Sequence, residues 1–179
     1  MDKRRRPLAQ DIGRILGGKM CPEDFIKLMN ATELNCATFE KVNPENAEDF
    51  VAICEKLGDE AYNYAVDLEK KNRTVTASEY NFNASALYRL GDYGIHGMTD
   101  EKMRIYGKLV NSFEKSKKLT RYEKCTTVEI PFMDKTMPGY LLMPDNAQKD
   151  IPIIIYVVGA TGFKEENYTA PYAIWERGC

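Results

Sequence analysis

Residues Ile151–Thr161 read IPIIIYVVGAT, and this stretch decides which fold the sequence predicts. Six apolar residues from Ile153 to Val158 follow one another without a charge, and Gly159 ends the run. A strand with one face in water would alternate polar and apolar residues. An unbroken run rich in β-branched residues instead predicts a strand buried on both faces, as in a parallel α/β sheet. The run is also too short for a buried helix.

A glycine turn and a helix are predicted after this strand. Gly-Ala-Thr-Gly occupies residues 159–162, and residues 164–177 are compatible with a helix that ends before Gly178. Strand, glycine turn and helix in this order present backbone N–H groups to an anionic group at the carboxyl end of the strand. A core strand followed by an ordinary turn is the alternative, and it stays open at this point.

Two shorter strands are predicted before the central one. Thr126–Phe132 (TTVEIPF) alternates as a half-buried strand, and Asp134–Lys135 forms a turn. Thr136–Met143 (TMPGYLLM) follows as a second strand, where Pro138 indicates an edge or a bulge. Strands behind a purely helical preface predict an α/β fold with a helical N-terminal layer.

The preface, residues 1–118, is predicted to be helical throughout. Its helices are Pro22–Asn30, a long helix from the N-cap Asn43 to Lys70, one from the capping box Thr76–Glu79 to about Leu90, and one from the cap Thr99 to about Lys118. Gly58 is expected to weaken or kink the long helix. On the last helix, Met103, Tyr106, Val110 and Phe113 are expected to face inward.

Composition narrows the class of function. Lys and Arg number 25 against 27 Asp and Glu, so no strong field favours a nucleic-acid or membrane partner, and Lys3–Arg6 is interpreted as a basic terminus. No signal peptide or run of transmembrane length is present, which predicts a cytoplasmic protein. The cysteines are scattered and odd in number, which predicts reduced thiols and no metal site: Cys21, Cys36, Cys54, Cys125 and Cys179.

The order of these motifs resembles the start of an α/β-hydrolase. The motifs are VEIPF at 128–132, MPGYLLMP at 137–144, IPIIIYVVGATGFKEE at 151–166 and a helix ending Glu-Arg-Gly at 176–178. The chain is most similar to the group with a helical N-terminal domain, which includes 2,6-dihydroxypseudooxynicotine hydrolase, the fermentation–respiration switch esterase and fungal pigment-pathway hydrolases. The resemblance covers about residues 75–179. It implies a helical cap domain over 1–120, involved in dimer contacts, and the start of the hydrolase core over 121–179.

The resemblance places the oxyanion hole at the backbone of Gly159, Ala160 and Thr161. Such a donor needs only a turn that aims its amide at developing charge, so the alanine side chain is acceptable. Thr161 stands where relatives often have aspartate. The resemblance implies neither a cofactor nor a metal.

The nucleophile of the family lies in a G-x-S-x-G elbow, followed by an acid and a histidine. This sequence contains no G-x-S-x-G, and Cys179 stands where the next strand is expected. We therefore expect a chain truncated before the elbow and inactive alone. His96 is expected to be solvated or structural, and neither Ser85 nor Ser112 is assigned a role because no base lies nearby in the sequence.

Two functions remain open. The first is the N-terminal portion of a serine α/β-hydrolase that acts on an ester or a β-keto (C–C) carbonyl. Its partners would be a small acyl or keto substrate, the missing C-terminal half or a partner chain, and a second copy through the helical domain. The second is a non-catalytic helical interaction module with hydrolase ancestry. A nucleotide-binding domain is disfavoured because neither G-x-G-x-x-G nor a P-loop is present.

Overall fold

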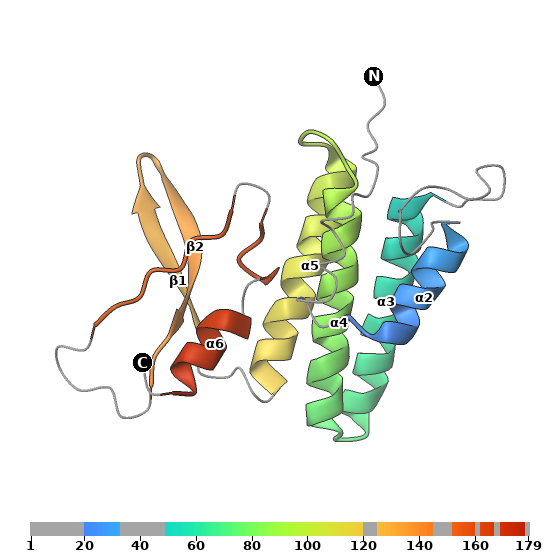
Figure 1. The fold of residues 1–179 in the computed structure, drawn as a ribbon, viewed down its shortest axis with the longest axis horizontal. Helices are drawn as coiled ribbons and strands as arrows, with labels where there is room; N and C mark the ends of the chain where they lie inside the picture. Colours follow the sequence, from blue (N-terminus) through green and yellow to red (C-terminus); the bar gives the residue numbers. More distant parts are fainter. Residues whose placement is uncertain are drawn as a thin grey trace.

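The computed structural model describes residues 20–32, 49–119, 125–144, 152–159, 162–166 and 169–177. Within them, a layer of helices is followed by a two-stranded antiparallel sheet and a short helix (Figure 1). Helix α4 packs between α3 and α5, and α2 lies against α3. The strands and α6 lie on the other side of α5 (Figure 1).

Helices α2 (Pro22–Ala31) and α3 (Phe50–Lys70) come first in this order. α2 confirms the predicted short helix. The predicted start of α3 is wrong, because the Asp49 carboxylate accepts a 2.9 Å hydrogen bond from the Ala52 amide and caps the helix. Aspartate caps a helix as well as asparagine does. Asp49 was therefore as good a candidate for the N-cap as Asn43. Asn43 itself lies outside the described residues.

Gly58 lies in the middle of α3, which continues through it as a single helix. A Cβ atom added at Gly58 would lie 2.5 Å from Cε1 of Tyr88 on the neighbouring helix α4. The glycine therefore allows a close approach of two helices, and the kink expected from its propensity is not needed.

Helix α4 (Thr74–Tyr93) is the centre of the layer, and every residue from Asn81 to Asp92 is buried. It starts before the predicted capping box, and no side chain caps it. The chain turns directly out of α3 instead, since Asn72 takes a φ of 57° and the Arg73 amide donates to the Leu68 carbonyl at 2.9 Å. This backbone turn provides a hydrogen-bond donor for a carbonyl at the end of α3 and determines where α4 starts.

Polar side chains of α4 fix its neighbours. Asn83 accepts a hydrogen bond from the Cys21 amide (2.8 Å) and donates to the Asp24 carboxylate (2.6 Å), which ties the start of α2 to α4. Ser78 donates to the Ser116 carbonyl on α5 at 2.8 Å. Because buried polar groups need partners, these contacts also fix how the helices align.

Helix α5 (Asp100–Leu119) confirms the predicted cap, since Thr99 Oγ1 accepts from the Lys102 amide at 3.1 Å. The predicted inward face is wrong at Met103, which is 49% exposed. The fully buried apolar side chains of α5 are Ile105, Leu109 and Phe113. The packing of α5 on α4 rotates the buried face away from the predicted one. Tyr106 and Val110 lie half-buried beside the buried face.

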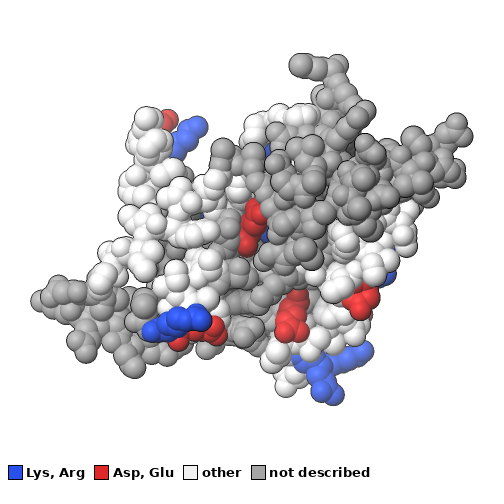
Figure 2. Space-filling view, viewed as in Figure 1, with Lys and Arg blue, Asp and Glu red and all other residues white. Residues whose placement is uncertain are grey.

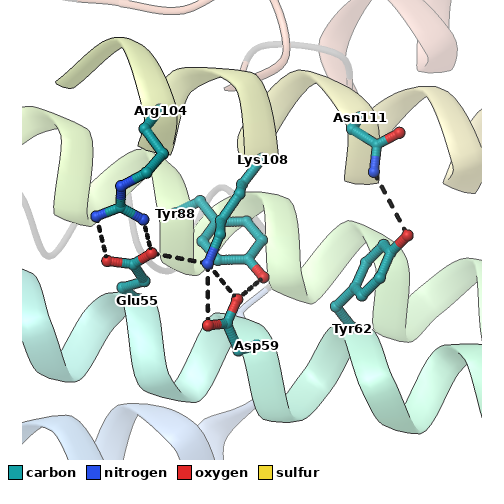
Figure 3. A network of polar contacts seen from close by, with 7 residues as sticks. All are labelled: Glu55, Asp59, Tyr62, Tyr88, Arg104, Lys108 and Asn111. Carbon is teal, nitrogen blue, oxygen red and sulfur yellow. Dashed lines mark hydrogen bonds and ion pairs between the residues drawn. The ribbon is translucent and has the colours of Figure 1, made fainter. Parts of the chain in front are cut away.

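A polar network on the helical layer joins α3 to α5 (Figure 3). The Arg104 guanidinium binds both carboxylate oxygens of Glu55, and Lys108 Nζ lies 2.7 Å from both Glu55 and Asp59. Asp59 also accepts from the Tyr88 hydroxyl at 2.6 Å. The bonds from Arg104 and Lys108 lower the pKa of Glu55 from its usual 4.5 to about 2.

Strands β1 (Cys125–Phe132) and β2 (Lys135–Leu142) form the predicted hairpin. Phe132 pairs with Lys135, so Met133 and Asp134 make the turn, one residue earlier than the predicted Asp134–Lys135. The expected half-burial of β1 is wrong, because nearly all of its residues are exposed. Only the end near Cys125 packs on helices, in a cluster that also holds Phe82, Phe113, Tyr140, Leu142 and Tyr172.

The central strand predicted at Ile153–Val158 does not form in this structure. Residues 152–159 adopt no regular structure, and Ile153, Ile155 and Val157 are each at least 80% exposed. A strand buried on both faces needs a sheet neighbour on each side, and no described segment pairs with this one. The helix predicted over 164–177 is shorter, and α6 spans Thr169–Trp175.

The molecular face in Figure 2 carries scattered charges of both signs over its described residues, without a patch of one sign. None of the described helices combines the length and the apolar character that crossing a membrane requires.

Candidate functional site

The turn predicted to hold an oxyanion hole is described at its two ends. The Gly162 amide donates a 2.8 Å hydrogen bond to the Gly159 carbonyl, which links the two ends of the turn. Ala160 and Thr161 themselves lie outside the described residues. A Cβ atom at Gly159 would meet nothing within 4 Å, whereas at Gly162 it would lie 3.0 Å from Val158 Cβ. Of the two glycines, Gly162 is therefore the one with little space for a side chain.

A cavity of about 420 Å³ opens directly beside this turn. Its walls come from the end of α4, the loop to α5, the first half of α5, the last residue of the turn and the residue after it. The lining residues are Asp92, Tyr93, Ile95, His96, Gly97, Met98, Lys102, Met103, Tyr106, Gly162 and Phe163. The cavity thus joins the helical layer to the segment that the resemblance marks as catalytic.

Lys102 shapes one wall of the cavity. Its ammonium donates to the carbonyls of Asp92 (2.7 Å) and Ile95 (3.1 Å) and lies 3.0 Å from the Asp92 carboxylate. These carbonyls belong to the last residues of α4 and the loop after it, where helix carbonyls lose their own partners. Lys102 therefore holds the α4–α5 loop in place.

Asp92 is an unusual group in this wall because it is almost fully buried. Burial raises the pKa of its carboxyl above the usual value, although the contact with Lys102 acts in the opposite direction. Among the described residues, its Oδ2 has no hydrogen-bond partner. Asp92 and Lys102 were not predicted from the sequence, where Asp92 stood only as part of a glycine-flanked helix end.

Most of the other side chains that line the cavity are aromatic rings or methionine thioethers. Tyr93, Tyr106 and Phe163 contribute rings, and Met98 and Met103 contribute flexible side chains. The rings of Tyr106 and Phe163 lie 6.3 Å apart between centroids. Such a lining suits an organic ligand with an apolar body, since ligand pockets combine apolar walls with few polar groups.

The other candidates from the sequence do not gather at this turn. His96 is exposed on the α4–α5 loop and lines the cavity, which leaves it able to touch a ligand. Ser85 and Ser112 are buried within α4 and α5, where a nucleophilic hydroxyl would be inaccessible. The three described cysteines are free: Cys21, Cys54 and Cys125. Burial raises the pKa of the Cys54 thiol, which disfavours its reactive thiolate.

Comparison with known proteins shows which class the chain resembles. No protein-family model matches the chain. The chain is 30% identical over 118 residues to the alpha/beta hydrolase xenA of Xenoacremonium sinensis, a match that covers 64% of this chain and 26% of that protein. It is 29% identical over the same length, with the same coverage, to the alpha/beta hydrolase pydG of an Acremonium species. The chain therefore resembles part of an α/β-hydrolase, as expected from its motifs.

A particular solved enzyme shares its fold. The structure of 2,6-dihydroxy-pseudo-oxynicotine hydrolase superposes with a TM-score of 0.55 at 13% sequence identity, covering 76% of this chain and 34% of that one. The expected fold class, a helical layer with an incomplete α/β-hydrolase sheet, is confirmed. The chain spans about a quarter of the length of the curated relatives that it matches.

Proposed function

We propose that this chain is the N-terminal portion of a serine α/β-hydrolase that acts on an ester or on a β-keto carbonyl, where a carbon–carbon bond is cut. One observation carries the proposal. The cavity lies between the α4–α5 loop and Gly162–Phe163, so the helical layer forms a wall beside the turn expected to hold the oxyanion. The similarity to α/β-hydrolases supports the reaction class.

The two halves of the cavity have different roles in this proposal. The aromatic and methionine side chains of the helical wall contact the apolar body of a small acyl or keto substrate and exclude water. The backbone amide of Ala160 donates to the oxygen of the tetrahedral intermediate, where a preorganised donor lowers the barrier. The helices up to residue 120 thus act as a cap domain.

In this proposal the catalytic triad comes from outside these 179 residues, which contain no G-x-S-x-G. The exposed segment 152–159 supports the same view, because its exposed apolar side chains fit a sheet completed by further strands. The missing C-terminal half or a partner chain would supply them. A second copy bound through the helical domain is a further proposed partner.

A first test concerns the chain alone. The purified protein should not be labelled by a fluorophosphonate, which reacts covalently with activated serines, because no elbow serine or triad histidine is present. Labelling that disappears when one particular serine is changed to alanine would contradict this expectation.

A second test concerns the turn, in a form of the protein that carries the nucleophile. Ala160→Pro removes the proposed donor and should lower kcat by about 10²–10³. Ala160→Ser keeps the amide and should cost far less. Equal losses in the two variants would show that side-chain volume, rather than the amide, matters at this position.

The alternative function is a non-catalytic helical interaction module. It is favoured by the described part of the helical layer, which packs a core of its own, whereas the described residues of the hydrolase part cluster only with residues of the helices. The coding sequence after codon 179 discriminates between the two functions. A continuing frame that encodes G-x-S-x-G supports the hydrolase, and an immediate stop codon supports the module.

A further inference from the structure

Two motifs that carried the resemblance contact each other in the structure. Tyr140, from the PGYL motif on β2, donates a 3.0 Å hydrogen bond to Oε1 of Glu165, from the Lys-Glu-Glu motif. Lys164 Nζ lies 2.5 Å from the same oxygen and 5.3 Å from the centroid of the Tyr140 ring. The hairpin is therefore joined to the segment that follows the oxyanion turn.

The same ammonium also reaches the helical layer. Lys164 Nζ lies 3.3 Å from the hydroxyl of Tyr106 and 5.8 Å from the centroid of its ring. Tyr106 belongs to α5 and lines the cavity, and its ring packs near Phe163. The helical layer, the hairpin and the segment after the turn thus meet at the ion pair of Lys164 and Glu165. We call this ion pair, together with Tyr106 and Tyr140, the clasp.

The clasp is built around a buried carboxylate, and its other members are partly buried. The side chain of Glu165 is 1% exposed and that of Lys164 is 24% exposed. A buried ion pair contributes little net stability compared with apolar side chains of the same size, because both charges lose their hydration. Such a pair requires specific geometry, however, since each charge needs its hydrogen-bond partners in place. The main effect of this ion pair is therefore to fix the positions of the residues that it joins.

The protonation states favour one arrangement of these donors. Burial and the neighbouring Glu165 carboxylate raise the pKa of Tyr140, so its phenol stays a donor. Burial lowers the pKa of Lys164, but its bonds to Glu165 and Tyr106 outweigh that effect, and the net shift is upward. The lysine is then charged and the tyrosine protonated at neutral pH.

We propose that Tyr140, Lys164 and Glu165 are positioning residues that hold Gly162 and Phe163, at the end of the predicted oxyanion turn, against the cavity wall of the helical layer. Lys164 follows two residues after Gly162, whose amide closes the turn onto the Gly159 carbonyl. The clasp thereby sets where the Gly162 end of the turn stands relative to Tyr106. Its catalytic meaning rests on the proposed function, because only an α/β-hydrolase would use amides of this turn as oxyanion donors.

The test is amide hydrogen exchange, followed by NMR, on the 179-residue chain and its variants. Lys164→Met and Glu165→Gln each remove a charge-assisted bond, and should raise the exchange rates of the Gly162 and Glu166 amides about 10- to 100-fold. Lys164→Arg keeps the charge and should stay much closer to the parent chain. Exchange in the core of α3 should not change in any of these variants.

Matched controls lie on the hairpin. Lys135 and Glu129 are exposed, so Lys135→Met and Glu129→Gln should leave the turn amides unchanged. Tyr140→Phe should raise exchange at the turn less than Glu165→Gln does, because Lys164 still holds the carboxylate. A smaller response at the turn than in α3, or an equal response to the control variants, would overturn the proposal.

The oxyanion role and the clasp can fail separately. If the turn does not bind an oxyanion, the exchange response to Lys164→Met and Glu165→Gln is still expected, while Ala160→Pro leaves kcat unchanged. If the clasp does not position the turn, the exchange rates stay constant whatever Ala160→Pro does.

Discussion

The helical layer and the segment 152–159 are both rich in apolar residues, yet the structure buries one and exposes the other. Leu87 and Ile105 on the helices are fully buried, whereas Ile153 is 83% exposed. A helix satisfies its backbone internally and needs only a packing partner for one face. A strand inside a sheet needs backbone partners on both edges, and these can come from distant parts of a chain. Apolar sequence therefore becomes core only where the required partner is present.

Hydrogen exchange on the dilute chain gives the largest expected contrast between the two regions. Amides in the cores of α3 and α4 should exchange at least about a thousandfold more slowly than those of Ile153–Val158, because only the helices open through unfolding of a packed core. Strong protection across Ile153–Val158 in a monomer would break the comparison. Protection that grows with protein concentration would instead indicate pairing between copies.

A pair of glycine substitutions sharpens the comparison within the helical layer. Gly58→Ala should destabilise the chain by about 1–3 kcal/mol, because the new Cβ meets the Tyr88 ring. Gly107 on α5 is the matched control: a Cβ there meets nothing within 4 Å, and Gly107→Ala should stabilise by about 0.5–1 kcal/mol. Urea unfolding measures both. A stabilising Gly58→Ala would show that α3 and α4 do not approach closely.

The smallest effect concerns the network on the helical layer. A carboxyl whose pKa is lower in the folded state, like that of Glu55 at about 2, adds stability above its unfolded pKa. That contribution is lost as the pH falls from about 4.5 towards 2. Glu55→Gln should therefore cost about 1 kcal/mol at pH 6 and much less at pH 2.5. Unfolding curves at several pH values measure this difference.

The control for the network is Glu60→Gln, an exposed carboxylate on the same helix, whose stability should follow that of the parent chain at every pH. Parallel curves for Glu55→Gln and the parent chain would show that the ion pairs with Arg104 and Lys108 contribute nothing.

Local patterns predicted much of the helical layer. Thr99 and Pro22 marked helix starts that the structure confirms. The start of α3 was mispredicted because Asn43 and Asp49 are equally good caps, and only tertiary packing selects between them. The environment of α4 could not be predicted, since its buried polar residues find partners on α2 and α5 that no spacing reveals.

The candidate site divides in the same way. Its turn was predicted from a glycine motif that is local in the sequence. The cavity wall was missed, because Asp92, Lys102 and Tyr106 reach the turn only through the packing of α4 and α5. Lys164 and Glu165 stood out as a motif, but the contact with Tyr140 spans 25 residues and depends on the docking of the hairpin.

The order of elements along the chain has a consequence for its synthesis. α3, α4 and α5 each pack on the element next to them in sequence, the arrangement that folds fastest, in milliseconds or less. A ribosome adds only about 5–20 residues per second, so the residues after Leu119 are still being made several seconds after α5 is complete. The surface of α5 that carries Tyr106 and Lys117 is then already formed when β1 emerges. The nascent hairpin therefore packs on a helical surface that has already folded. The apolar segment at 152–159 is made after the hairpin and still needs strand partners.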